Sequence, residues 1–224
     1  MAYDDGEKTL QVRARLAGFL FLAVNAFYIA SLLAGAADSD EMRRVAVAFQ
    51  AIASAATIAL AWAFYELLKQ AGRGLALLAP LFRTAGASLL GVPALFRLLV
   101  LNKVGTPTPA LDEAGLALLT RARFVSFHVA NIYFCAGAAI FFYLLFKSRF
   151  IPRAISAFGI AATILGAAYT LAEIGAPAFA GVLTYFAPLV FLAETMTGGW
   201  LIIVGARLRH AQPPDLRDPP VSPI

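Results

Sequence analysis

Charged residues are scarce in this chain, and their scarcity argues against an ordinary soluble fold. Only 14% of its 224 residues are Asp, Glu, Lys or Arg, whereas 61% are hydrophobic. Soluble domains average about 25% charged and about 45–50% apolar residues. The excess lies in runs of about 20 residues, the length that a helix needs to cross the ~30 Å hydrocarbon core of a bilayer. We therefore expect an all-α membrane protein that lies in a lipid bilayer.

Residues needed for several known chemistries are also missing. The single cysteine, Cys135, excludes an intrachain disulfide. Of the two histidines, His128 lies within a run and His210 at the end of the last predicted helix, so we expect no metal site and no haem held by two histidines. No lysine lies inside a hydrophobic run, which excludes a retinal-type Schiff base, and the sequence assigns no cofactor. No basic stretch is interleaved with aromatic residues outside the runs, so we expect no nucleic-acid partner.

Six hydrophobic runs follow one another, and each has the length of one membrane crossing. They cover residues 16–37, 45–68, 75–101, 120–146, 154–174 and 185–208, and Pro93 interrupts the third. We expect a six-helix bundle over residues 13–210, after a polar cytoplasmic lead at 1–12 and before a Pro-rich disordered tail at 211–224. The first run also resembles a signal peptide, but it exceeds the usual apolar length of ~7–15 residues, so we expect a retained helix.

An even number of crossings places both termini on one side, and the basic residues indicate which side. The side of the termini carries eleven basic residues: Lys8, Arg13, Arg15, Lys69, Arg73, Lys147, Arg149, Arg153, Arg207, Arg209 and Arg217. The opposite side carries five: Arg43, Arg44, Lys103, Arg121 and Arg123. Because cytoplasmic loops are enriched in Lys and Arg, we expect both termini in the cytoplasm.

Polar residues near the middle of the runs are the strongest candidates for function. Asn25, Arg83, His128 and Glu194 each lie eight or nine residues into a run, which is about 12–14 Å at ~1.5 Å per helical residue. A charge at this depth costs ~2.5–3.5 kcal/mol, so we expect Arg83 and Glu194 to pair inside the bundle. The pair either fixes helix packing or forms a ligand or proton site. Thr197 and the two glycines that follow it suit a close approach of another helix.

Further polar residues extend this set toward the outer side. They are Gln50, Arg97, Arg121, Arg123 and Glu173. In the fourth run His128, Asn131 and Cys135 recur at spacings of three and four, so they share one helix face, which we expect to be buried. His128 is either a hydrogen-bonded core residue or a proton acceptor, because its charge changes near neutral pH. Together these residues suggest a polar cleft that opens outward and has a charged floor.

Four segments resemble a known family. They are R-L-A-G-F-L-F-L at 15–22, L-A-L-L-A-P-L-F-R at 75–83, F-Y-L-L-F-K-S-R-F-I-P-R at 142–153 and A-E-T-M-T-G-G-W-L at 193–201. They are similar to bacterial six-helix membrane proteins catalogued as domain of unknown function 4386. The resemblance implies six helices in a bacterial inner membrane, and it maps Arg15, Arg83, His128 and Glu194 onto polar positions of the family. It implies no reaction, substrate or cofactor.

Three classes of function remain open from the sequence. The first is binding or transport of a small or amphipathic molecule, such as a lipid, in the outward cleft. The second is a non-catalytic subunit that packs against another membrane protein chain. The third is an intramembrane enzyme that uses His128 and Glu194 as acid and base. No nucleophile or metal set accompanies these two residues, so we favour a protein that is not an enzyme.

Overall fold

The computed structural model describes residues 2–101, 112–176, 178, 181 and 183–207. Helices dominate these residues, and no strand occurs among them. The elements are α1 (Ala2–Gly35), α2 (Asp40–Leu68), α3 (Arg73–Leu89), α4 (Gly91–Val100), α5 (Glu113–Ser148), α6 (Arg153–Gly175), the 3-10 turn η1 (Thr184–Phe186) and α8 (Ala187–Ile203). The predicted all-α fold is confirmed for this part of the chain.

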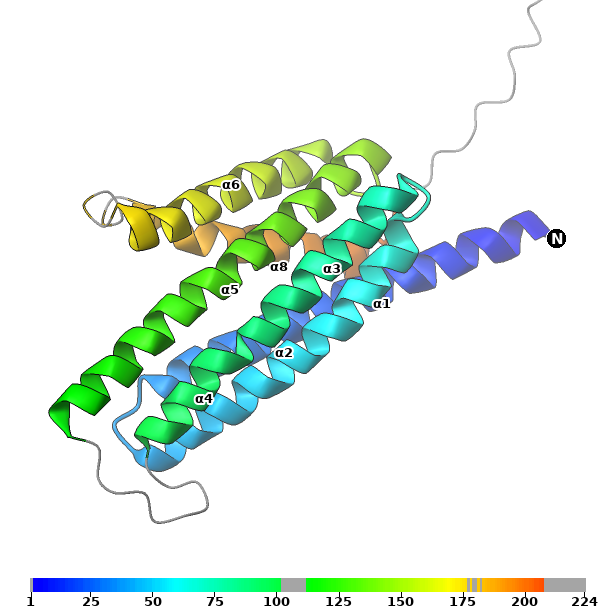
Figure 1. Cartoon of the computed structure of the whole chain (residues 1–224). Helices are drawn as coiled ribbons and strands as arrows, with labels where there is room; N and C mark the ends of the chain where they lie inside the picture. Colours follow the sequence, from blue (N-terminus) through cyan, green and yellow to red (C-terminus); the bar gives the residue numbers. More distant parts are fainter. Residues whose placement is uncertain (1, 102–111, 177, 179–180, 182, 208–224) are drawn as a thin grey trace, which may run out of the picture.

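The helices form a closed ring in sequence order (Figure 1). α1 packs against α2, α2 against α3 and α4, these two against α5, α5 against α6, and α6 against α8, which returns to α1. α2 also touches α5 across the ring. α3 and α8 are not neighbours in this ring, so a side chain that joins them must cross its centre.

Five helical segments of the described chain are long and apolar enough to cross a membrane. They are Gly6–Gly35, Asp40–Leu68, the joined α3–α4 segment Arg73–Val100, Glu113–Ser148 and Arg153–Gly175. α8 contributes a shorter apolar helix, Pro188–Ile203. Large hydrophobic side chains such as Leu32, Trp62 and Ile203 are exposed on the outside of the bundle, as a lipid-facing surface requires. The chain is therefore a multi-pass membrane protein.

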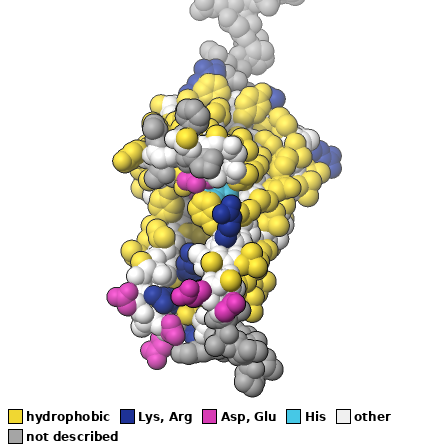
Figure 2. All heavy atoms as spheres, turned by 60° about the vertical axis from the view of Figure 1, so that its left-hand side comes forward, with side chains coloured by type: hydrophobic (Ala, Val, Ile, Leu, Met, Phe, Trp, Pro, Cys, Tyr) yellow, Lys and Arg dark blue, Asp and Glu magenta, His cyan; other side chains and the backbone are white. Residues whose placement is uncertain are grey.

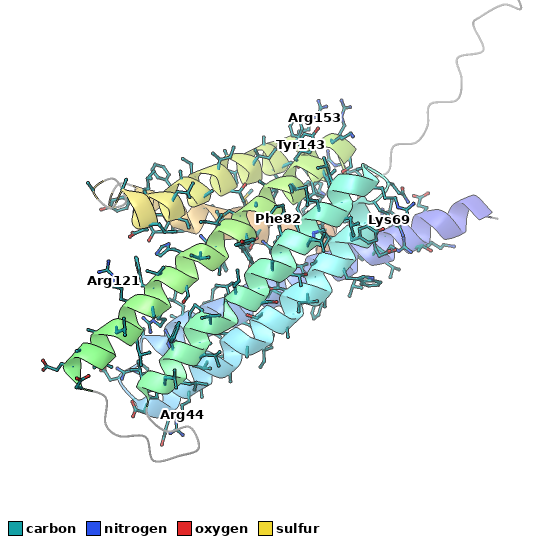
Figure 3. All side chains as sticks on the ribbon, viewed as in Figure 1. Arg44, Lys69, Phe82, Arg121, Tyr143 and Arg153 are labelled. Atoms are coloured by element: carbon teal, nitrogen blue, oxygen red, sulfur yellow. The ribbon has the colours of Figure 1, made fainter. Side chains whose placement is uncertain are left out.

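The two ends of the bundle carry different basic residues. Figure 3 shows Lys69 and Arg153 at one end and Arg44 and Arg121 toward the other. This arrangement agrees with the assignment of these residues to opposite sides of the membrane. The predicted tail at 211–224 lies outside the described residues.

Two predicted boundaries at helix starts are wrong. α1 begins at Ala2, so the predicted polar lead is the first part of a helix that extends beyond the bundle in Figure 1. Glu, Lys, Gln and Arg are good helix formers and no proline precedes residue 16, so polarity alone does not end the helix. α5 begins at Glu113, where the Asp112 side chain accepts a hydrogen bond from the Gly115 N–H at 2.7 Å. Residues 113–119 are therefore continuous with the predicted fourth helix.

The third and last runs also differ in detail from the prediction. The helix of the third run breaks at Leu90, one turn before Pro93. Proline has no N–H to donate to the carbonyl four residues earlier, and its ring clashes with that carbonyl. Gln50 of α2 donates to the Leu90 carbonyl at 2.8 Å. α8 ends at Ile203, before residue 208, and Gly205 follows with a positive φ of 79°.

Glycines bring the helices close at the level of the buried polar residues. A Cβ added at Gly137 of α5 would lie 2.7 Å from Arg83 Cγ and 2.9 Å from the Ala79 carbonyl of α3. A Cβ at Gly198 of α8 would lie 3.2 Å from the Gly18 carbonyl of α1. Gly198 thus gives the predicted close approach, with α1 as the neighbour. Gly199 faces open space and does not contribute to this close approach.

Candidate functional site

The centre of the ring is occupied by an ion pair. Arg83 Nη1 of α3 donates to Glu194 Oε1 of α8 at 2.8 Å, and the two side chains are 1% and 3% exposed. The pairing predicted from depth and sign is therefore confirmed. Because α3 and α8 are not neighbours, this contact joins opposite sides of the ring.

The Arg83 side chain is held in a fixed orientation by its surroundings. Its Cζ lies 3.6 Å from the ring centroid of Phe134 and 5.8 Å from that of Phe21. Gly137 leaves room for its aliphatic stem, so the guanidinium can reach the centre of the bundle. Stacking on an aromatic face suits a planar guanidinium and restricts its rotation. The roles of Phe134 and Gly137 were not evident from the sequence, because the spacing of residues within one helix does not show which other helix it faces.

Arg83 uses only part of its hydrogen-bonding capacity. Its Nε and Nη2 are buried and have no hydrogen-bond partner among the described residues. The same holds for Thr197 Oγ1, which lies three residues after Glu194 on α8. Residues three apart share a helix face. The ion pair is thus accompanied by three buried polar atoms that the described protein does not satisfy.

α1 and α2 add polar groups to the same centre. Asn25 Nδ2 donates to Thr195 Oγ1 of α8 at 3.3 Å. The Tyr28 hydroxyl lies near Ser54 and Thr57 of α2 and close enough to Arg83 and Glu194 to be affected by their charges. Tyr28 was missed from the sequence, although its spacing of three from Asn25 places both on one face of α1.

The polar face of α5 divides between two environments. His128 and Cys135 are 2% and 3% exposed and Asn131 is partly buried, so the predicted burial of this face is confirmed. Asn131 Nδ2 donates to Thr170 Oγ1 of α6 at 2.7 Å. Cys135 lies close enough to Arg83 and Glu194 to be affected by both charges.

His128 is separated from this centre by aromatic packing. Its ring centroid lies 4.4 Å from that of Phe124, 5.4 Å from Phe127 and 5.7 Å from Tyr169 of α6. The charged residue that affects it is Glu173. No contact between His128 and Glu194 occurs among the described residues, which gives little support to these two as an acid/base pair. The same part of the chain contains no group of three His, Cys, Asp or Glu side chains that could hold a metal ion.

The predicted outer residues do not form a single ring. Gln50 donates a hydrogen bond to the Leu90 carbonyl at the helix break, and Glu173 lies near His128. Arg97 of α4 is close to Arg43 and Arg123, and its guanidinium lies against Gly35 at the end of α1. Figure 2 shows one face of the bundle, on which basic side chains and uncharged polar or backbone atoms lie between hydrophobic surfaces and acidic side chains gather near one end.

The family model described as "Domain of unknown function (DUF4386)" matches residues 14–205. The chain belongs to the DUF4386 family. The matched segment contains the ion pair, its surrounding glycines and the whole polar face of α5. No curated protein and no solved structure matches the chain. Membership of DUF4386 therefore supplies no reaction, and the function must be argued from the geometry of the site.

Proposed function

We propose that this protein binds a small molecule through a polar group at the Arg83–Glu194 centre. The observation that carries the proposal is the incomplete hydrogen bonding of Arg83, whose Nε and Nη2 are buried without a partner among the described residues. A pair that only fixed helix packing would be expected to satisfy its donors, because an unsatisfied buried group costs about 1–3 kcal/mol and a charged one more. A bound molecule that accepts these hydrogen bonds removes that cost.

The surroundings of the centre support a small or amphipathic molecule rather than a large polar one. Arg83 is the largest fully buried side chain, and the aromatic rings of Phe21 and Phe134 flank it. Thr197 Oγ1 and the Tyr28 hydroxyl supply further polar contacts. Binding sites for small molecules combine mainly apolar walls with a few placed polar groups in this way.

The proposal includes six crossings of a bacterial inner membrane, with both termini in the cytoplasm. α3 and α4 together make one crossing, and α8 makes the sixth. The 17 residues of α8 span about 25 Å, so η1 and the residues up to Arg207 complete the distance across a ~30 Å core. The end with Lys69 and Arg153 then faces the cytoplasm, and the end near Arg97 faces the periplasm.

Cysteine labelling tests this topology. In a Cys135→Ala background we expect an impermeant reagent added from the periplasm to label Arg121→Cys and to leave Lys8→Cys and Gln212→Cys unlabelled. Strong periplasmic labelling at position 8 or 212 would contradict the proposed orientation.

The binding function itself is tested by what co-purifies with the protein. The chain would be extracted from native membranes into nanodiscs, and bound molecules would be released and identified by mass spectrometry. We expect a stoichiometric small molecule with the wild type and with Arg153→Gln, a control that removes an arginine at the other end of the bundle, where it lies over the ring of Phe146. We expect it to be lost from Arg83→Gln. A molecule that Arg83→Gln retains, or an empty wild-type centre together with a stoichiometric partner chain, would contradict the proposal.

A further inference from the structure

The two unpartnered donors of Arg83 lie on one edge of its guanidinium. Nη1 donates to Glu194, which leaves Nε and Nη2 without a partner. In a planar guanidinium the Nε–H bond and the nearer Nη2–H bond are parallel. Two parallel N–H groups match the two oxygens of a carboxylate, which accepts both hydrogen bonds at once. This edge is planar and rigid, unlike the ammonium of a lysine.

The two donors are oriented in the unliganded structure, but they are closed off from solvent, so a ligand has to displace neighbouring side chains to reach them. Phe134 stacks on the guanidinium at 3.6 Å, Gly137 leaves room for the stem, and Glu194 holds the opposite side of the group. Preorganised donors lose little conformational freedom on binding, which favours affinity. The arrangement therefore favours an acceptor of one shape, with two coplanar oxygens.

The charge balance of the centre limits what can bind there. Arg83 and Glu194 together are neutral, and a carboxylate would leave the centre with one negative charge in the membrane interior, which is unfavourable. One proton taken up with the anion restores neutrality.

From these observations we infer that the bound molecule is a monocarboxylate, held by Nε and Nη2 of Arg83, and that Glu194 takes up one proton when it binds. This inference rests on the proposed binding function. The proton comes from water and goes to the carboxylate of Glu194, which becomes a neutral acid. The ligand stays an anion paired with Arg83, so the net charge of the centre is unchanged.

The other groups that face Glu194 do not offer a better proton acceptor. Arg83 of α3 is a cation and stays protonated. Tyr28 of α1 and Cys135 of α5 are weak acids that are neutral at pH 7 and carry their own proton. On α6, Gly166 lies against Val190 of α8, one turn before Glu194, and glycine has no side chain to titrate.

The experiment compares carboxylates with neutral molecules of the same shape. The purified protein in nanodiscs would be titrated calorimetrically at pH 5.5, 6.5 and 7.5 with acetate, butyrate, benzoate and laurate. The matched probes are the corresponding amides. For at least one carboxylate we expect the apparent affinity to rise about tenfold for each unit fall in pH, as uptake of one proton requires. The amides should bind at least about tenfold more weakly at pH 6.5.

Two variants separate the roles of the pair. Glu194→Gln imitates the protonated acid, so it should bind the carboxylate without pH dependence and more tightly than the wild type at pH 7.5. Arg83→Lys keeps the charge but loses the two parallel N–H groups of the guanidinium. The apparent affinity for the carboxylate should therefore fall about 10- to 100-fold. The unliganded melting temperature and the gel-filtration profile would show that each variant is folded.

Three results would overturn the inference: no carboxylate binds, an amide binds as well as the carboxylate, or Glu194→Gln keeps the pH dependence of the wild type. Failure of the inference and failure of the proposed function are distinguishable. If a neutral molecule co-purifies with the wild type and is lost from Arg83→Gln, only the inference fails. If nothing co-purifies and no probe binds, both fail.

Discussion

Two glutamates of this protein pair with basic residues in very different surroundings. Glu66, near the end of α2, contacts Arg13 at 3.2 Å and Lys69 at 2.8 Å, and the side chains of both basic residues are 35% exposed. Glu194, at the centre, contacts only Arg83 among the described residues, and neither side chain reaches solvent. At the end of the bundle two cations share one carboxylate, whereas at the centre one cation retains two unused donors.

The difference shows where hydrogen bonding is left incomplete. Water can satisfy any donor that Arg13 or Lys69 leaves free, so the pairing at Glu66 is complete without a further molecule. The donors of Arg83 have no such access, and an unsatisfied charged donor in the membrane interior is costly. This difference between the two pairs is the reason why we propose a ligand at the centre and none at Glu66.

The largest expected effect is the loss of one partner from the central pair. Arg83→Gln and Glu194→Gln should each reduce the free energy of unfolding of the unliganded protein by about 3–5 kcal/mol, because each leaves a buried charge uncompensated. The double variant should recover part of the combined loss. Reversible unfolding in mixed micelles would measure the cycle. Strictly additive losses would show that the two side chains do not stabilise each other.

A smaller effect is expected from the packing that positions Arg83. Gly137→Ala places a methyl group 2.7 Å from Arg83 Cγ and 2.9 Å from the Ala79 carbonyl, so overpacking should cost about 1–3 kcal/mol. The matched control is Gly199→Ala on α8, which meets nothing within 4 Å and should stabilise its helix slightly. Thermal unfolding compares the two. Equal responses would mean that α3 and α5 are not in close contact at this level.

The smallest effect is expected at the exposed pair. Glu66→Gln removes the charge that Arg13 and Lys69 share, but both cations remain in contact with water. The melting temperature should fall by at most about 2 °C, and less at high salt, because solvent screens such pairs. A fall as large as that of Glu194→Gln would remove the distinction between the two glutamates.

The sequence was sufficient for the features that depend on one helix at a time. Run lengths predicted the helices, and depth and sign together predicted the contact between Arg83 and Glu194. Helix boundaries were less accurate, because α1 continues through polar residues that favour a helix and the break near Pro93 falls one turn earlier.

Features that depend on which helices are neighbours could not be read from the sequence. Gly198 has a spacing that suits close packing, but only the ring order shows that its partner is α1. His128 and Glu194 lie at similar depths, yet His128 turns toward Tyr169 of α6. The stacking of Phe134 on Arg83 has no periodic signal, since aromatic residues are common along α5 from Phe124 onward.

An experimental density map of the protein purified from its native membrane would test the proposed binding at Arg83 most directly. We expect density for a molecule larger than water beside Arg83, with acceptor atoms about 2.7–3.2 Å from both Nε and Nη2. Glu194 should remain in contact with Nη1 of the same side chain. A map in which a protein side chain or isolated waters satisfy Nε and Nη2 would rule out the proposed ligand and leave the pair with a structural role alone.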